Sequence, residues 1–283
     1  MGLMVDWKKI PKIDAHIHLM PKDVIAANRG NGDPFVEYGG VYDYQALMER
    51  YHIETAFVMP FNDPYMLSMD FKVQTVHSNL LDIAAALPEK LCCFADVDIR
   101  NSLDETLKVL DAALSQDAFI GIKLHPSNAG YPADGRYYEG IFEYANAKNA
   151  LIEIHSYPRA HLPDDVCSPI RIQNLLKKYP KVRLSIAHLG GMQFEALYGL
   201  NAYFNFSAVL PDMVERFGIG KTNEILRAIG VEKLVFATDY PDSRCIKPNE
   251  IYDEYFEILG AMDFSREEAE NICKNNALKM IGG

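Results

Sequence analysis

The chain has 283 residues, 49% of them hydrophobic, and carries 28 basic against 39 acidic side chains, for a formal net charge of -11 at pH 7. This balance, with no cluster of Lys and Arg along the chain, disfavours nucleic acid and anionic membranes as partners. The apolar content suffices for a large core, and the length suits a single α/β barrel domain of roughly 250 residues.

The N-terminal stretch and the cysteines indicate where the protein resides. The sequence MGLMVDWKKIPKID lacks the basic start and apolar core of a signal peptide, and Asp6 stands where an N-myristoylation motif needs Ser or Thr. No apolar run approaches the roughly 20 residues that cross a bilayer. The cysteines are odd in number and lack paired metal-ligand spacing, so we expect reduced thiols in a soluble, cytoplasmic protein. The five are Cys92, Cys93, Cys167, Cys245 and Cys273.

Eight apolar runs rich in β-branched residues recur at intervals of roughly 30 residues, the size of one β-α unit. We expect each run to form a strand. The runs are the segments 12–19, 54–60, 91–99, 118–126, 151–158, 182–191, 202–209 and 233–241.

Amphipathic segments separate these runs. Leucines at helical spacing mark the segment 102–116, and Pro180 ends another helical pattern that begins near residue 168. The alternation predicts a parallel sheet covered by helices, and eight units predict its closure into one (β/α)8 TIM barrel over residues 1–283. A doubly wound open sheet is the alternative.

Two long connections and a terminal helix complete the pattern. The connections, at about 21–40 and 126–140, follow the carboxyl ends of strands, where barrel active sites are built. Ser265, followed three residues later by Glu268, predicts a capping box for a terminal helix. We expect this helix to seal the barrel.

The stretch IDAHIHL carries His16 and His18 on one side of the first strand, because side chains two residues apart point the same way. A pair of packed or polar histidines would equally explain this spacing. In a closed barrel, however, ionisable residues at the ends of other strands project toward the same rim, where nitrogen and oxygen ligands can enclose a divalent cation. These residues are Lys123, His125, His155, His188 and Asp239.

Five stretches appear in the order that is typical of one known family: DAHIHL, GIKLHP, EIHS, AHLGG and FATDYP. On these motifs the sequence resembles the amidohydrolase superfamily, specifically its amidohydrolase 2 branch of metal-dependent hydrolases and decarboxylases. They extend from Asp14 to Pro241, and the final NNALKMIG resembles the closing helix of that family. The resemblance implies a distorted (β/α)8 barrel.

The resemblance also implies a ligand set. A divalent ion, zinc first, would be held by His16, His18, His155 and Asp239, while His188 would face the substrate as a catalytic residue or serve as a further ligand. The alternative for each is a hydrogen-bonded residue of the core or rim. A cation among such groups lowers the pKa of a bound water. Asp239 can accept its proton, and His188 can donate a hydrogen bond to an oxygen that gains charge.

Lys123 and His125 have several interpretations. A carboxylated Lys123 would bridge two metal ions, but one ion is favoured, with the lysine ion-paired inside the barrel or binding a substrate carboxylate. His125 would contact the substrate or only form a loop hydrogen bond. Glu153 and Asp14, by their alternation with His155 and His16, could orient the ligands, or form ordinary ion pairs.

The remaining candidates carry weaker signals. We expect His52, His77 and His161 to be surface or helix residues, because they lack strand-end positions. Several residues after strand ends could recognise an anionic or aromatic substrate, or simply be solvated. They are Arg136, Tyr137, Tyr138, Tyr157, Arg159 and Arg244.

These features predict a metal-dependent hydrolase that acts on a small-molecule ester, amide or lactone. The resemblance leaves non-oxidative decarboxylation or hydration of an aromatic or unsaturated carboxylic acid as an alternative. An alternative of another class is a catalytically silent barrel that binds a metal or metabolite. Barrels of this branch are often dimers, so the resemblance also implies a possible homodimer.

Overall fold

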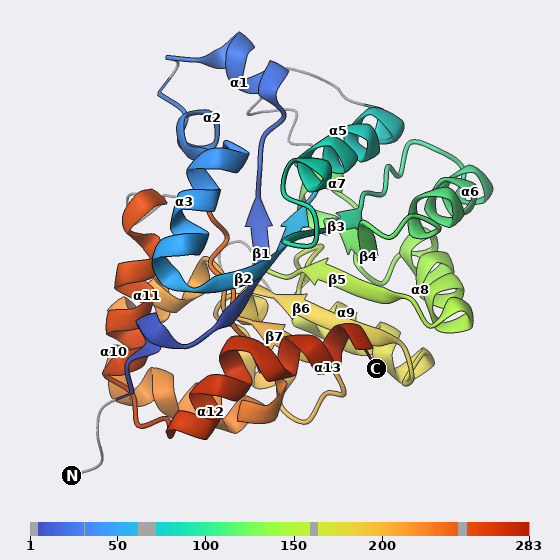
Figure 1. The fold of residues 1–283 in the computed structure, drawn as a ribbon. Helices are drawn as coiled ribbons and strands as arrows, with labels where there is room; N and C mark the ends of the chain where they lie inside the picture. Colours follow the sequence, from blue (N-terminus) through green and yellow to red (C-terminus); the bar gives the residue numbers. More distant parts are fainter. Residues whose placement is uncertain (1–4, 31, 62–71, 159–163, 243–247, 283) are drawn as a thin grey trace.

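The computed structural model describes residues 5–30, 32–61, 72–158, 164–242 and 248–282. Eight parallel strands form one sheet in which neighbours in the chain are neighbours in space, with helices packed around them (Figure 1). The strands are β1 (Lys12–His18), β2 (Ile53–Met59), β3 (Leu91–Ala95), β4 (Phe119–Leu124), β5 (Leu151–His155), β6 (Arg183–Ala187), β7 (Tyr203–Asn205) and β8 (Leu234–Val235). Each lies within a predicted run or begins one residue before it.

The sheet curls until its last strand meets its first. Ile17 and Tyr240 form a parallel bridge, and the amide of His18 donates to the carbonyl of Tyr240 at 2.7 Å. Below this point the amide of Ala15 donates to the carbonyl of Phe236 at 3.0 Å. These bonds confirm the predicted barrel and exclude an open sheet. The shortness of β7 and β8 and the register shifts in β1 and β3 make the barrel distorted.

A register shift between Asp14 and Ile17 decides which way the β1 side chains point. Ala15 packs in the apolar cluster inside the barrel, and His16 also points inward, to Glu153 on β5. Adjacent residues of a regular strand cannot do this, so the shift acts as a bulge. Asp14 therefore points outward and does not orient a histidine ring, contrary to the alternation argument.

Helices follow each strand except where short turns replace them. They are α1 (Lys22–Asn28), α2 (Pro34–Tyr38), α3 (Val41–Tyr51), α5 (Val73–Ala86), α6 (Leu103–Leu114), α7 (Pro126–Ala129), α8 (Arg136–Lys148), α9 (Pro169–Lys178), α10 (Val209–Ile229), α11 (Ile251–Gly260), α12 (Arg266–Glu270) and α13 (Asn276–Gly282). Ser102 caps α6 in a capping box with Glu105, and the leucines of α6 pack on the core. The two long connections contain α1, α2, α7 and the start of α8.

The C-terminal helices close the bottom of the barrel, opposite the ends of the strands that carry the histidines (Figure 1). Ser265 and Glu268 form the predicted capping box. Ala277 and Met280 pack into the apolar cluster inside the barrel, and the amide of Phe236 donates to the carbonyl of Ile272 at 2.9 Å. Among the described helices, none combines the length and the apolar character needed to span a bilayer.

His77 and His52 both lie at helices, as predicted. His52 is exposed at the end of α3, and His161 lies outside the described residues. His77, by contrast, is 8% exposed on the inner face of α5, where its Nε2 accepts the backbone N–H of Asp96 at 2.8 Å. Burial lowers the pKa of His77 from 6.5 to about 4, because a buried imidazolium loses hydration.

The shifted pKa of His77 predicts a pH-dependent stability. Between pH 6.5 and about 4 the unfolded chain binds a proton at His77 that the folded chain rejects, so the free energy of unfolding falls as pH drops through this window. At about 1.4 kcal/mol per pKa unit, the full loss is about 3 kcal/mol. The variant His77→Gln keeps an acceptor for the backbone N–H of Asp96 but has no imidazole to protonate. We expect its free energy of unfolding, measured by denaturant titration, to fall by about 3 kcal/mol less than that of the unmodified protein across this pH window. Identical pH slopes for the two proteins would contradict the prediction.

Candidate active site

The predicted site residues gather at the carboxyl end of the barrel. His16 and His18 close β1, His155 ends β5, His188 follows β6 and Asp239 follows β8. Burial is high, since His16 is 1% exposed, His188 3% and Asp239 8%. Residues from opposite ends of the chain thus meet where parallel strands end, the usual position of active sites in such barrels.

Three of these side chains offer ligand atoms within 4.8 Å of one another: His16, His18 and Asp239. Asp239 Oδ1 lies 3.3 Å from His16 Nε2 and 3.4 Å from His18 Nε2. The backbone reinforces this arrangement, because the amide of Asp239 donates to the carbonyl of His16 at 2.9 Å. Imidazole nitrogens and a carboxylate oxygen suit zinc and similar divalent ions. The three residues could hold a divalent metal ion.

The remaining predicted ligand, His155, lies outside this group of three. Its ring stacks on that of His125 with the ring centroids 3.9 Å apart, and lies 4.7 Å from the ring of His188. His188 in turn lies 5.1 Å from the ring of His16. With His18, whose ring centroid lies 5.4 Å from that of His16, five histidine rings form one continuous cluster, and ligation by His155 stays a prediction.

Lys123 lies inside the barrel beside the candidate ligands. Its side chain is 2% exposed, and Nζ lies 3.3 Å from His16 Nε2. Burial lowers the pKa of Lys123 to about 8, against the opposing attraction of Glu153 and Asp239. Burial, with the positive charge of Lys123, holds the pKa of His16 well below its usual value. His16 is therefore neutral at neutral pH, the form that binds metals.

A cavity of about 380 Å³ opens beside Lys123 and His125. Both predicted substrate contacts line it, and His125 also accepts the backbone N–H of Asn128 at 3.2 Å through Nδ1, so it forms a loop hydrogen bond as well. The other lining residues are Pro60, Asp96, Val97, Asp98, Ile99, Arg100, Asn128 and Ala129.

The acidic and basic groups after β3 were not singled out from the sequence. Asp98 pairs with Arg100, with Arg100 Nη2 2.7 Å from Asp98 Oδ2, and Asp96 lines the same cavity. Their position directly after the strand LCCFA was the signal that could have identified them, because the ends of parallel strands meet at one rim.

The other predicted substrate contacts differ in position. Tyr157 lies at the cluster, with its ring 6.0 Å from that of His188, and its hydroxyl donates to Asp212 at 2.6 Å. Arg136 is exposed at the first residue of α8, and no contact within the described parts of the chain joins it to the histidines. Tyr138 is buried in the core. Arg159 and Arg244 lie outside the described residues.

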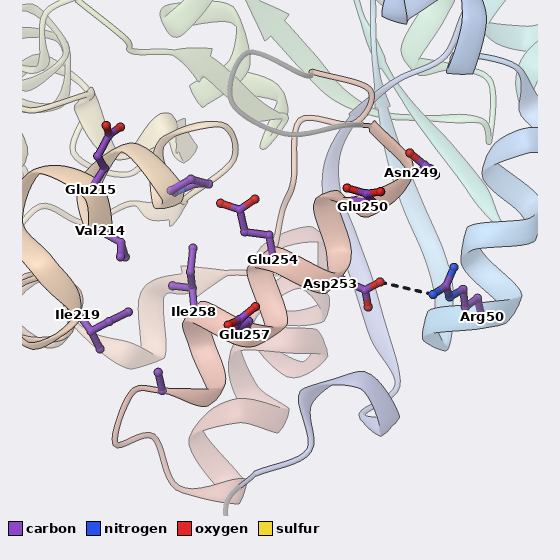
Figure 2. Close-up of a pocket in the computed structure, with 12 residues that line it drawn as sticks. Arg50, Val214, Glu215, Ile219, Asn249, Glu250, Asp253, Glu254, Glu257 and Ile258 are labelled. Atoms are coloured by element: carbon purple, nitrogen blue, oxygen red, sulfur yellow. Dashed lines mark hydrogen bonds and ion pairs between the residues drawn. The ribbon is translucent and has the colours of Figure 1, made fainter.

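A larger hollow, of about 940 Å³, lies away from the histidines, between α10 and α11 (Figure 2). Its walls combine carboxylates of α11 with apolar residues such as Val214 and Ile219 on α10. Arg50 reaches it from α3 and pairs with Asp253 at 3.4 Å. The hollow contains none of the predicted site residues, so volume alone does not identify the active site.

Comparison with known proteins identifies the family of the chain. The family model described as Amidohydrolase (Amidohydro_2) matches residues 13–283, and the chain belongs to this family. No curated protein matches the chain.

Solved structures with the same fold include enzymes of two kinds. A 2,6-dihydroxybenzoate decarboxylase in complex with 2,6-dihydroxybenzoate is 14% identical with a TM-score of 0.70, covering 96% of this chain and 99% of its own. A 5-carboxyvanillate decarboxylase from Novosphingobium aromaticivorans, complexed with manganese, is 13% identical with a TM-score of 0.70, covering 99% and 98%. A probable 2-pyrone-4,6-dicarboxylic acid hydrolase from Acinetobacter baumannii is 15% identical with a TM-score of 0.68, covering 97% and 100%.

The ligand assignment makes a direct prediction. We expect His16→Ala and Asp239→Ala to lose bound divalent metal while the barrel still folds, because each removes one ligand atom from the rim and little apolar packing. Elemental analysis of protein purified without added metal or chelator measures the content, and circular dichroism reports the fold. Full metal occupancy in both folded variants would contradict the assignment.

Proposed function

We propose that the protein is a metal-dependent hydrolase that acts on a small-molecule ester, amide or lactone. The observation that carries the proposal is the convergence of His16 Nε2, His18 Nε2 and Asp239 Oδ1 beside a cavity at the ends of the strands. A structural metal site needs a closed ligand set and no neighbouring acid or base. Here the buried His188 lies against the cluster.

The donor set favours one divalent ion, zinc first, held by His16, His18 and Asp239 with His155 as the proposed fourth ligand. Such an ion supplies an activated water near neutral pH. Inductively coupled plasma mass spectrometry of the native protein is expected to find one ion per chain. Two ions would instead make Lys123 a carboxylated bridge between them, because its lowered pKa of about 8 makes the neutral amine, the form that carboxylation needs, more available than in an ordinary lysine.

The side chains around the cluster have separate roles in proton transfer, charge stabilisation and substrate binding. Asp239 accepts the proton of the attacking water and passes it to the leaving group, and His188 faces the oxygen that gains charge. Lys123, inside the barrel and lining the cavity, binds a carboxylate of the substrate. Asp96 and Arg100 also line the cavity, and its volume of about 380 Å³ suits a small-molecule substrate.

Substrate profiling tests the reaction class. We expect turnover of a lactone or ester from a panel that also contains amides and aromatic carboxylic acids, with the His16→Ala variant as the inactive control. Release of carbon dioxide from an aromatic acid, without hydrolysis of any panel member, would replace the proposal by its alternative. Bound metal without turnover on any class would favour a silent binding barrel.

Non-oxidative decarboxylation is the second candidate. Two observations favour it: the buried Lys123 suits a substrate carboxylate, and two of the neighbours with a TM-score of 0.70 are decarboxylases. The same ligands would also serve hydration of an unsaturated acid. Because these neighbours share 14% identity or less with the chain, the hydrolase remains our first choice on the donor set and its adjacent acid/base groups.

The role of His188 gives a separate prediction. We expect His188→Asn to retain bound metal and to lose about 10²- to 10³-fold in kcat, the usual cost of removing one group that stabilises a developing oxyanion. Parallel measurement of kcat and metal content distinguishes the roles. Loss of the metal would move His188 into the ligand set, and unchanged kcat would remove it from the mechanism.

A further inference from the structure

A buried chain of hydrogen bonds connects His16 on β1 with His188 after β6. It passes through Glu153 on β5 and through Asn205 and Ser207 at the end of β7. All five side chains are at most 3% exposed. Because buried polar groups must satisfy one another, the direction of each hydrogen bond can be worked out in turn.

Asn205 is fixed first. Its Oδ1 lies 3.3 Å from the backbone N–H of Ser207 and 3.4 Å from that of His188. Backbone N–H groups can only donate, so this atom is the amide oxygen. The NH₂ group therefore points the other way, where Nδ2 donates to Glu153 Oε1 at 2.6 Å.

Ser207 follows from Asn205. Its Oγ lies 2.6 Å from Asn205 Oδ1, and since that oxygen only accepts, the hydroxyl proton of Ser207 must lie between them. The same Oγ is 3.0 Å from His188 Nδ1, and the carbonyl oxygen of Ser207 is 2.9 Å from it. Both oxygens are acceptors toward the ring. His188 must then carry its proton on Nδ1.

His16, at the other end of the chain of hydrogen bonds, also carries its proton on Nδ1. Glu153 Oε1, which accepts from Asn205, lies 3.0 Å from His16 Nδ1. On the opposite side of the ring, Lys123 Nζ lies 3.3 Å from Nε2, and an ammonium has no acceptor. His16 therefore also carries its proton on Nδ1 and accepts at Nε2.

We infer that Asn205 is a positioning residue which, through Glu153 and Ser207, holds His16 and His188 in the same tautomer, with hydrogen on Nδ1 and a lone pair on Nε2. This assignment makes His16 Nε2 an acceptor only 3.3 Å from Asp239 Oδ1. Two acceptors so close repel each other unless positive charge lies beside them, as it does with Lys123 and would with a bound cation.

The inference deepens the proposed function, and its catalytic meaning rests on that proposal. A neutral His188 of this tautomer accepts a hydrogen bond at Nε2. On sequence grounds, His188 is expected to donate a hydrogen bond to an oxygen that gains charge. In this tautomer, His188 can donate from Nε2 only after it takes up a proton there. The tautomers themselves are independent of whether the enzyme hydrolyses or decarboxylates its substrate.

Nuclear magnetic resonance of the full chain tests the tautomers directly. In metal-free protein labelled with ¹⁵N-histidine, at neutral pH, where Lys123 is still an ammonium, long-range ¹H–¹⁵N correlations distinguish protonated from unprotonated ring nitrogens. We expect protonated Nδ1 and unprotonated Nε2 for both residues, assigned with His16→Gln and His188→Asn. A protonated Nε2 in either neutral ring would overturn the inference, even if the enzyme proves to be a hydrolase.

Variants of β7 test the part played by Asn205. We expect Asn205→Leu to weaken binding of Zn²⁺ by up to about 10-fold in a chelator competition. Removing the direct partner of a ligand usually costs about 10- to 100-fold, and Asn205 acts on His16 only through Glu153. Ser207→Ala serves for comparison: it keeps the hydrogen bonds from Asn205 through Glu153 to His16, so its affinity for Zn²⁺ should be unchanged although the hydroxyl beside His188 is lost. Unchanged affinity in a folded Asn205→Leu protein would overturn the role of Asn205.

Asn205→Asp is a size-matched second variant in case the leucine variant fails to fold. It keeps an acceptor for Ser207 and His188 but brings an oxygen against Glu153 Oε1. We therefore expect the ring signals of His16 to change and those of His188 to stay. A change at His188 alone, or at neither ring, would overturn the proposed connection.

Discussion

One buried carboxylate holds the first strand of the barrel to the end of the last. Asp14, fully buried, accepts from the hydroxyls of Thr238 and Tyr252 at 2.6 Å each, and from the amides of Thr238 and His16 at 3.2 and 3.3 Å. Burial raises the pKa of Asp14 to about 6, although these hydrogen bonds oppose the shift. Because Thr238 directly precedes Asp239, this closure also brings the carboxylate of Asp239, a candidate ligand, to the histidines of β1.

The site above this closure places several ionisable groups where water is scarce. Burial holds the pKa of His16 well below its usual value, and Lys123 has a lowered pKa because little solvent stabilises its charge. A neutral imidazole and a carboxylate are the protonation states that bind a divalent cation. The polar chain through Asn205 keeps the rings in place, since an unsatisfied buried donor is costly.

The apolar interior of the barrel and its polar rim have different roles. Ile13, Phe57, Phe94 and Val235 fill the lower barrel, and Met280 covers it from below, so an apolar core lies beneath the candidate site. The loop after β3 bears Asp98 and Arg100, which line the cavity beside Lys123, and in barrels of this kind the loops at the carboxyl ends of the strands vary with the reaction. Known structures with this barrel accordingly include decarboxylases and a probable hydrolase.

The sequence by itself determined the strands, the barrel, the terminal capping box and the positions of His16, His18, His188 and Asp239 at the rim, because apolar periodicity and strand ends are local properties. Only the tertiary structure decided what each ring touches. A bulge in β1 turned Asp14 away from the site, and the stacking of His155 on its neighbour, the cavity after β3 and the contacts of Asn205 depend on register between strands that are distant in the chain. Spacing along one strand carries no information about these contacts across the barrel.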